Sequence, residues 1–176
     1  MRGAVLLLAS ALFLASCRKP VEETRIVGFD PESSTGLLVS GWSGWEQTAE
    51  GDSFVWAQAR QARLRVDSRA DGDRLVRFRA WPYRFPGAPP QTVTLFVNDA
   101  RVESATLGDG PRVYAFIAPK AAFRPGANEV RLEFAYAEAP RDREPGGADA
   151  RTLAAAFDWL ELVPPRPGPG AETKKS

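Results

Sequence analysis

Aromatic side chains offer the clearest chemistry in this sequence, and that chemistry is recognition. The chain of 176 residues contains five tryptophans, and a flat indole can pack against the apolar face of a sugar ring with little loss of conformational entropy. Trp45 closes the run Gly41-Trp-Ser-Gly-Trp45 in a polar stretch, so we predict that its ring is exposed. Trp56 and Trp159 fall within strand-like stretches, and we predict that both belong to the core.

The run Trp81-Pro-Tyr-Arg-Phe85 is the second concentration of recognition chemistry. It leads into the proline-rich stretch 82–90, and a charged stretch follows at 137–152. If successive strands alternate in direction, both stretches emerge as loops at the same end of the fold. That end would combine aromatic and hydrogen-bonding groups suited to a polar ligand. The candidate ligand-binding residues are therefore Trp45, Trp81, Tyr83, Arg84, Asp149 and Arg151.

Most of these residues also have a structural interpretation. Trp81 and Phe85 could close one end of the core while the prolines stiffen the loop. An ion pair between Asp149 and an arginine could lock the long loop instead of facing a ligand. The residues alone leave both interpretations open.

The lack of histidine in the sequence removes most catalytic machinery. A Ser-His-Asp triad and a His-bearing zinc site are excluded, and the single cysteine, Cys17, excludes an intrachain disulfide. Two carboxylates could still hydrolyse a glycosidic bond, but no acid pair stands out, so we predict that the protein is not an enzyme. The formal net charge of +1 gives no basic field for nucleic acid.

Alternation of apolar and polar residues identifies the elements that must position these side chains. Val93, Leu95 and Val97 alternate with polar or outward residues, and Val130 begins a second such series that ends near residue 136. A period of two over four or more residues predicts half-buried strands. Turn signals recur every eight to twelve residues, so we predict an all-β fold of about eight strands in two antiparallel sheets, a jelly-roll β-sandwich.

The N-terminal stretch has the pattern of an export signal. Arg2 precedes an uncharged apolar run at 4–15, which has the length of a signal-peptide core. The run ends in Leu14-Ala15-Ser16-Cys17, which resembles the lipobox of bacterial lipoproteins. The resemblance implies cleavage before Cys17, acylation of that cysteine and a membrane-anchored lipoprotein. An ordinary secretory signal is the alternative, and Arg18 at the next position favours the outer membrane or periplasm over the inner membrane.

Composition then divides the chain into four segments. Residues 1–16 form the predicted signal peptide, and residues 17–35 form the lipidated cysteine with a polar, flexible tether, in which only residues 26–29 could form an edge strand. Residues 36–163 form the predicted β-sandwich. Residues 164–176 are rich in proline and glycine and are predicted to be disordered.

Three stretches of the sandwich resemble the galactose-binding-like β-sandwich family. Residues 94–102 are similar to its hairpin of strand, Val-Asn-Gly and strand, with Asp99 where glycine is usual. Residues 114–132 resemble its next two strands and their Pro-Gly-x-Asn turn, and residues 155–162 resemble its closing strand. The resemblance implies a non-catalytic, carbohydrate-binding accessory module, often with a structural calcium ion.

The leading hypothesis is a lipid-anchored module of the bacterial cell envelope that binds a glycan without catalysis. A structural or assembly subunit that binds an envelope protein is the alternative. The predicted partners are the membrane, through the anchor, and a glycan or envelope protein, with no nucleic acid. No cofactor is predicted, although a calcium site built from carboxylate and carbonyl oxygens remains possible.

Overall fold

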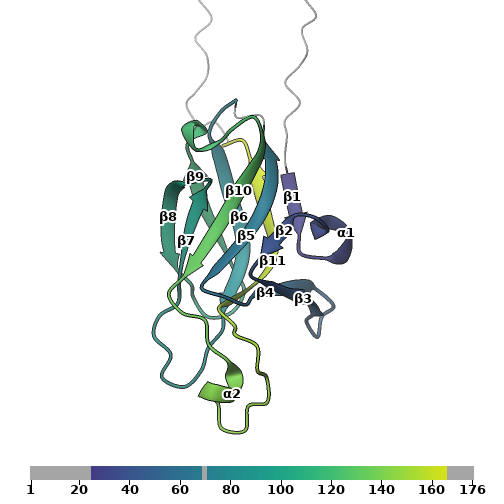
Figure 1. Ribbon diagram of the computed structural model, residues 1–176, viewed down its shortest axis with the longest axis vertical. Helices are drawn as coiled ribbons and strands as arrows, with labels where there is room; N and C mark the ends of the chain where they lie inside the picture. The colour runs from purple at the N-terminus through teal and green to yellow at the C-terminus, as the bar shows by residue number, and fades with distance from the viewer. Residues whose placement is uncertain (1–24, 69–70, 166–176) are drawn as a thin grey trace, which may run out of the picture.

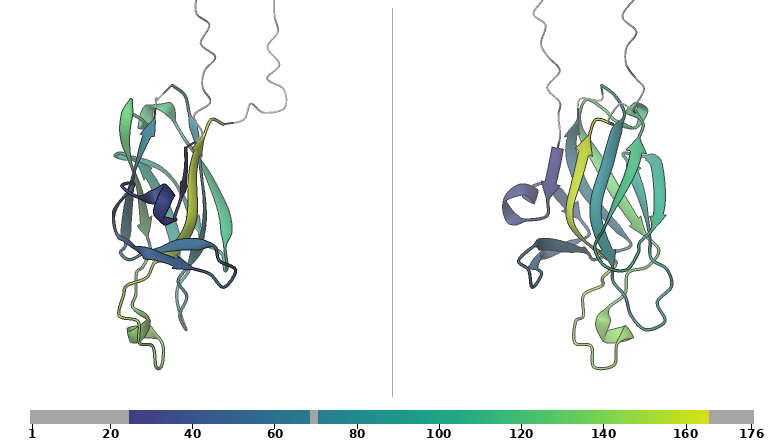
Figure 2. Two further views of the ribbon diagram at one scale, coloured as in Figure 1. Left: turned by 90° about the vertical axis from the view of Figure 1, so that its right-hand side faces the viewer. Right: turned by 180° about the vertical axis from the view of Figure 1, so that it is seen from behind.

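Two antiparallel sheets packed face to face make up the body of the protein (Figures 1 and 2). The structure, a computed structural model, describes residues 25–68 and 71–165. The predicted signal peptide, Cys17 and residues 166–176 of the predicted tail lie outside the described residues. Within them, no helix is long and apolar enough to cross a bilayer.

The first sheet has the order β3-β4-β11-β6-β9; β4 pairs with residues 155–157 of β11, and β1 pairs with residues 159–162. Its long central strands are β6 and β11, which pair over most of their length. The strands are β1 (Arg25–Gly28), β3 (Trp42–Gln47), β4 (Ser53–Ala57), β6 (Arg74–Pro82), β9 (Arg112–Ala118) and β11 (Ala155–Val163).

The second sheet has the order β2-β5-β10-β7-β8. Its strands are β2 (Leu38–Ser40), β5 (Gln61–Ser68), β7 (Thr92–Val97), β8 (Ala100–Thr106) and β10 (Gly126–Phe134). Three short helical turns complete the described structure: α1 (Pro31–Ser34), η1 (Lys120–Ala122) and α2 (Pro140–Arg143). The predicted all-β sandwich is confirmed, with eleven strands in the described residues instead of about eight.

The alternating sequence pattern determines which face of each strand is buried. In β10, Val130, Leu132 and Phe134 point inward while Arg131 and Glu133 are part-exposed on the outer face. Each fully buried aliphatic or aromatic side chain of this kind contributes about 1.5–3 kcal/mol relative to exposure. Phe157 of β11 lies at the centre of the core, with its ring 5.5–6.1 Å from four other aromatic rings.

The asparagines of the two family-like motifs are structural. Asn98, in the β7–β8 turn, has a φ of 52° and donates from Nδ2 to the Asn128 side-chain oxygen at 2.9 Å and to the Ala122 carbonyl at 2.7 Å. Asn128 in turn donates to the carbonyl of Arg124 at 2.9 Å. The two side chains therefore hold the β7–β8 turn against the connection that leads into β10.

The polar segment predicted as a tether to residue 35 is partly folded, which corrects the predicted boundary. Residues 25–28 form β1 along β11, and Phe29 is fully buried in the core. Asp30 then caps α1, because its carboxylate accepts hydrogen bonds from the backbone N–H groups of Glu32 and Ser33, both at 2.9 Å. The signal was readable in the sequence as an aspartate followed by proline and glutamate, a pattern typical of a helix start.

Gly41 separates β2 from β3, which belong to different sheets. Its φ is +80°, and a Cβ atom there would lie 2.3 Å from the Gln61 carbonyl oxygen. Only glycine combines that backbone conformation with so close an approach. The chain therefore crosses from one sheet to the other at this residue.

Candidate functional site

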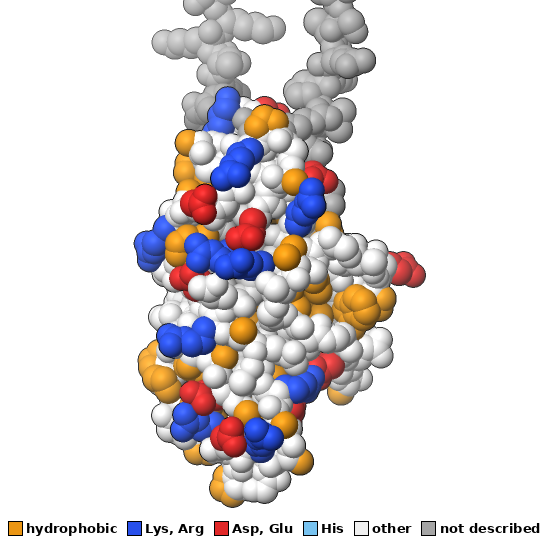
Figure 3. All heavy atoms as spheres, viewed as in Figure 1, with side chains coloured by type: hydrophobic (Ala, Val, Ile, Leu, Met, Phe, Trp, Pro, Cys, Tyr) orange, Lys and Arg blue, Asp and Glu red, His pale blue; other side chains and the backbone are white. Residues whose placement is uncertain are grey.

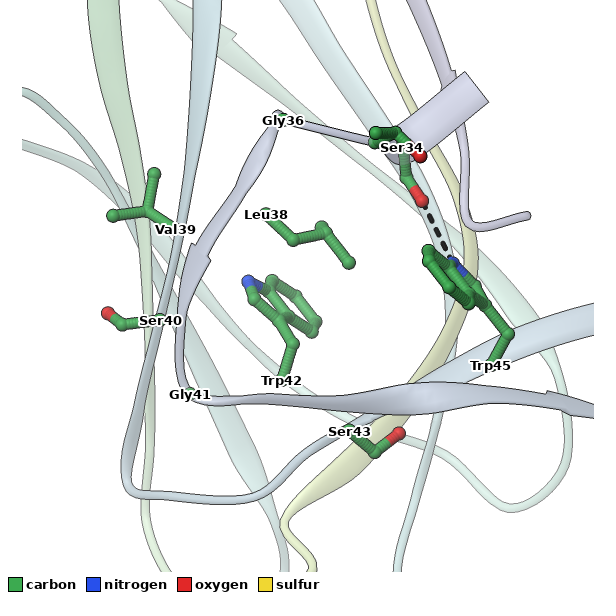
Figure 4. A pocket seen from close by; sticks show the side chains of 10 residues that line it. Ser34, Gly36, Leu38, Val39, Ser40, Gly41, Trp42, Ser43 and Trp45 are labelled. Atoms are coloured by element: carbon green, nitrogen blue, oxygen red, sulfur yellow. Dashed lines mark hydrogen bonds between the residues drawn. The ribbon is translucent and has the colours of Figure 1, made fainter. Parts of the chain in front are cut away.

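A pocket of about 330 Å³ opens where the chain crosses between the sheets (Figure 4). Its walls come from the end of α1, from β2 and from the start of β3. Trp42 and Trp45 stand on opposite sides of the opening, with Leu38 between them. We call this site the edge pocket. Figure 3 shows hydrophobic side chains gathered between α1 and β3, on a face that otherwise mixes charges of both signs.

The two indoles of the edge pocket are held in different ways. Trp42 donates from Nε1 to the Arg63 carbonyl at 2.7 Å and packs against Phe29 and Phe157, so its position is set by the core. Trp45 donates from Nε1 to the hydroxyl of Ser34 at 3.0 Å, while 45% of the residue surface stays exposed. One wall of the pocket is therefore built into the core, and the other presents an accessible aromatic face.

The lining of the edge pocket is uncharged. Its described lining residues include no charged side chain. Ser43 does not act as a nucleophile, because its hydroxyl accepts a hydrogen bond from the Trp56 backbone N–H at 2.8 Å and donates to the Gly44 carbonyl at 2.6 Å. An uncharged ligand with an apolar face and hydroxyl groups suits such a pocket.

A second aromatic surface lies on the outer face of the six-stranded sheet, the sheet nearer the viewer in Figure 2 (right). Ala156 of β11 pairs with Trp56 of β4 on one side and with Trp81 of β6 on the other. Phe54 packs against both indoles, with ring centroids 6.1 Å from Trp56 and 5.3 Å from Trp81. We call these four residues the aromatic platform. Its rings are part-exposed, while Ala156 between them is fully buried.

Charged side chains border the aromatic platform. Glu46 of β3 pairs across the sheet with Phe54 and accepts a hydrogen bond from Arg151 at 2.7 Å. On another side, Arg79 lies two residues before Trp81 on the same face of β6 and forms an ion pair with Asp158 at 2.5 Å. The platform therefore differs from the edge pocket in being open and bordered by charge.

The prediction that Trp56 and Trp159 belong to the core is wrong. Val55 and Ala57 are the fully buried residues of β4, so the alternation turns Trp56 outward. Trp159 is part-exposed beside a bulge of β11 and lies under the guanidinium of Arg77, 5.7 Å from the ring centre. The alternation in Phe54-Val-Trp-Ala57 could have shown this, because small inward residues sit between large aromatic ones.

The two loops predicted to share one end do so (Figure 1), but their candidate residues do not form one open site. Tyr83 is 7% exposed, donates its hydroxyl to Glu144 at 2.7 Å, and has its pKa raised by burial. The Arg84 guanidinium instead donates a hydrogen bond to the Asp109 carboxylate at 2.9 Å. Trp81 belongs to the aromatic platform and Trp45 to the edge pocket.

Asp149 and Arg151 show the geometry of the structural alternative. Arg151 donates to the Asp149 carboxylate at 2.7 Å, and the pair links the long loop to Glu46 of β3. The hydrogen bonds from Arg151 hold the pKa of Asp149 below its usual value. Both groups are thus committed to a contact between the loop and the sheet.

The described residues show no acidic cluster for the calcium ion that the family resemblance implies. Residues 25–68 and 71–165 contain no group of three or more acidic, cysteine or histidine side chains arranged to hold a metal. The nearest approach is a pocket with three aspartates, and an arginine side chain already points into that cluster. Calcium favours negatively charged oxygen ligands, and the guanidinium of Arg79 already pairs with a carboxylate there.

Comparison with known proteins relates the fold, and only the fold, to carbohydrate-binding modules. No family model and no curated protein matches the sequence. A family 6 carbohydrate-binding module of a laminarinase from Zobellia galactanivorans superimposes with a TM-score of 0.51, 8% identity and coverage of 81% of this chain and 100% of that one. This chain therefore has the jelly-roll β-sandwich fold that this module also has.

Two further solved structures agree. A family 35 module from Clostridium thermocellum gives a TM-score of 0.51 at 12% identity, covering 80% of this chain and 97% of that one. A mannanase with a family 35 module from Podospora anserina gives 0.51 at 12% identity, covering 85% of this chain and 29% of that one. Identities this low leave the binding residues to be argued from this chain itself.

Proposed function

We propose that this chain is a non-catalytic glycan-binding module and that the edge pocket holds the sugar. The observation that carries the proposal is the pair of indoles, Trp42 and Trp45, on opposite sides of one hollow (Figure 4). A pyranose has two apolar faces, and each can pack against an aromatic ring. The fixed position of Trp42 lowers the entropy lost on binding.

Size and charge narrow the ligand. A volume of about 330 Å³ lies at the lower end for small-molecule sites, which suits one or two sugar units. Because the lining side chains are uncharged, a neutral glycan is favoured over a uronic or sulfated one. The exposed face of Trp45 leaves room for the chain to continue into solvent.

The aromatic platform is the competing location for the same class of ligand, so the experiment must separate the two surfaces. Tryptophan fluorescence is titrated with a panel of neutral and acidic oligosaccharides, after a glycan array has selected them. We expect Trp45→Ala to reduce affinity about five- to tenfold, because a stacked ring contributes about 1–1.5 kcal/mol. Trp81→Ala is the matched control and should leave the affinity unchanged.

Three outcomes are informative. Loss of binding in Trp81→Ala alone would move the site to the aromatic platform. Loss in neither variant would remove both surfaces. Silence of the wild-type protein across the whole array would contradict the glycan proposal and favour an envelope protein partner, which crosslinking in membranes would then detect.

We also propose that the module is tethered to the cell envelope through an acylated Cys17. The support is the run Leu14-Ala15-Ser16-Cys17, which resembles a lipobox. One fatty chain alone binds a membrane only marginally, so stable anchoring needs the several acyl chains of a lipoprotein. Intact-mass spectrometry of the protein from membranes should show a diacylglyceryl adduct on Cys17. A free, unmodified mature N-terminus would contradict this proposal without affecting the one on glycan binding.

A further inference from the structure

A third surface feature, which includes the Arg79–Asp158 pair at the border of the aromatic platform, is a polar pocket of about 440 Å³ beside the bulge in β11. Its described lining contains three carboxylates and one guanidinium: Asp30, Asp52, Asp158 and Arg79. The carboxylates come from three separate parts of the chain, the N-cap of α1, the start of β4 and the closing strand. Of the three, Asp158 has a buried side chain, and a buried carboxylate needs a positively charged or hydrogen-bonding partner.

Asp158 is the carboxylate of this pocket that most needs a positively charged partner. Its side chain is 8% exposed, and its Oδ1 atom is fully buried with no hydrogen-bond partner. Arg79 reaches its other oxygen at 2.5 Å and lies 3.8 Å from Asp52. Burial raises the pKa of Asp158 and the guanidinium of Arg79 opposes that rise, so the arginine is what favours the ionised carboxylate.

We propose that Arg79 is a built-in cation at this cluster, and that the module folds and keeps its stability without calcium. The guanidinium lies between Asp158 and Asp52, where a divalent ion would have to bind, and it would repel that ion. Asp30 is also committed, because one of its oxygens accepts both N-terminal N–H groups of α1. A calcium ion entering the cluster would have to displace this fixed positive charge from the buried carboxylate.

The first test uses the wild-type protein. Its Tm is measured by calorimetry in excess EDTA and in millimolar calcium chloride, and we expect the two values to agree within about 1 °C, because an ion that does not bind the native state cannot stabilise it. A Tm that rises with calcium or falls with EDTA would overturn the proposal. Since the readout is thermal stability, the result is independent of whether the protein binds glycans.

The second test assigns the role to Arg79. Arg79→Ala should lower the Tm by about 10 °C, because it leaves a buried carboxylate without a partner. Adding Asp158→Asn to that variant should recover most of the loss. If the Tm of Arg79→Ala and the Tm of the double variant are lowered equally, Arg79 acts through packing and the proposal fails.

Two further variants keep the test interpretable. Arg77→Ala, two residues away on the same face of β6 and paired with Glu161 at 2.6 Å, is the matched control, and its Tm should fall less. Arg79→Lys keeps the charge and should stay near the wild type even if Arg79→Ala fails to fold. Acidification should also favour Arg79→Ala relative to the wild type. The raised pKa of its Asp158 makes the folded state bind a proton more readily, so stability is lost as the pH rises through that pKa.

Discussion

The edge pocket and the aromatic platform are both built from tryptophans, yet the backbone makes them in opposite ways. The platform stands on three neighbouring, hydrogen-bonded strands, where Trp56 and Trp81 flank Ala156 in register. The pocket arises where regular pairing stops, at the crossing through Gly41 and beside the short helix α1. Regular strands give a flat surface, whereas a break in the strand gives a concave one.

The two surfaces also differ in what their rings do for the fold. Phe54 packs against both platform indoles, and together they cover Ala156, so they stabilise the sheet. Trp45 in the pocket makes one hydrogen bond and is 45% exposed. An exposed aromatic ring that contributes little to folding is more consistent with selection for binding. This contrast is the reason for placing the sugar in the pocket.

Removal of the core ring behind the pocket should have the largest effect. Phe157→Ala deletes the residue against which Trp42 packs, and a buried phenylalanine replaced by alanine costs about 3–5 kcal/mol of unfolding free energy. Urea unfolding measures it, with Val113→Ala as the exposed control. If Phe157→Ala costs less than about 1 kcal/mol, Phe157 does not support the pocket wall.

Gly41→Ala should cause the next largest loss of stability, because this residue is where the chain crosses between the sheets beside the edge pocket. The new Cβ would approach the Gln61 carbonyl to 2.3 Å in a backbone with a φ of +80°, which costs roughly 1–3 kcal/mol. Gly44→Ala is the matched control, because its Cβ would enter open space. Urea midpoints compare the two variants. Equal midpoints would show that the crossing tolerates a side chain.

The sequence allowed the sheets to be predicted but not the pocket, and Gly41 shows why. Alternation in residues such as Val130, Leu132 and Phe134 is local, so the strands and their buried faces could be predicted from it. The pocket depends on contacts between distant residues, such as the hydrogen bond from Trp42 to the Arg63 carbonyl. No local pattern marks such a contact. Of the candidate site residues, Trp45 was correctly predicted to be exposed, because it lies in a polar stretch of the sequence.

The candidates on the two loops show a different limit. Strand direction predicted that the loops share one end, and they do. The partners of Tyr83 and Arg84, which are Glu144 and Asp109, depend on loop conformation that strand patterns do not determine. With the same neighbours in sequence, a charged loop residue can face solvent, a ligand or another loop.

A comparison of single tryptophans sharpens the contrast between the two surfaces. Trp81→Ala should cost about 1–2 kcal/mol, because the ring covers apolar surface of the sheet. Trp45→Ala should cost less than about 1 kcal/mol, since the side chain is largely exposed already. Both values come from urea unfolding. The reverse order would mean that Trp45 is a structural residue and would weaken its assignment to binding.

The smallest effect should come from the charged border of the platform. Arg151→Ala removes exposed contacts to Asp149 and Glu46, and surface pairs of this kind contribute little to stability because solvent screens them. The pKa of Asp149 is lowered by Arg151, so its contribution is present above the unfolded-state pKa and is lost as the pH falls through the folded value. The wild type and Arg151→Ala should therefore differ near neutral pH and converge in acid. A difference in stability that grows on acidification would show that the loop is held by something other than this pair.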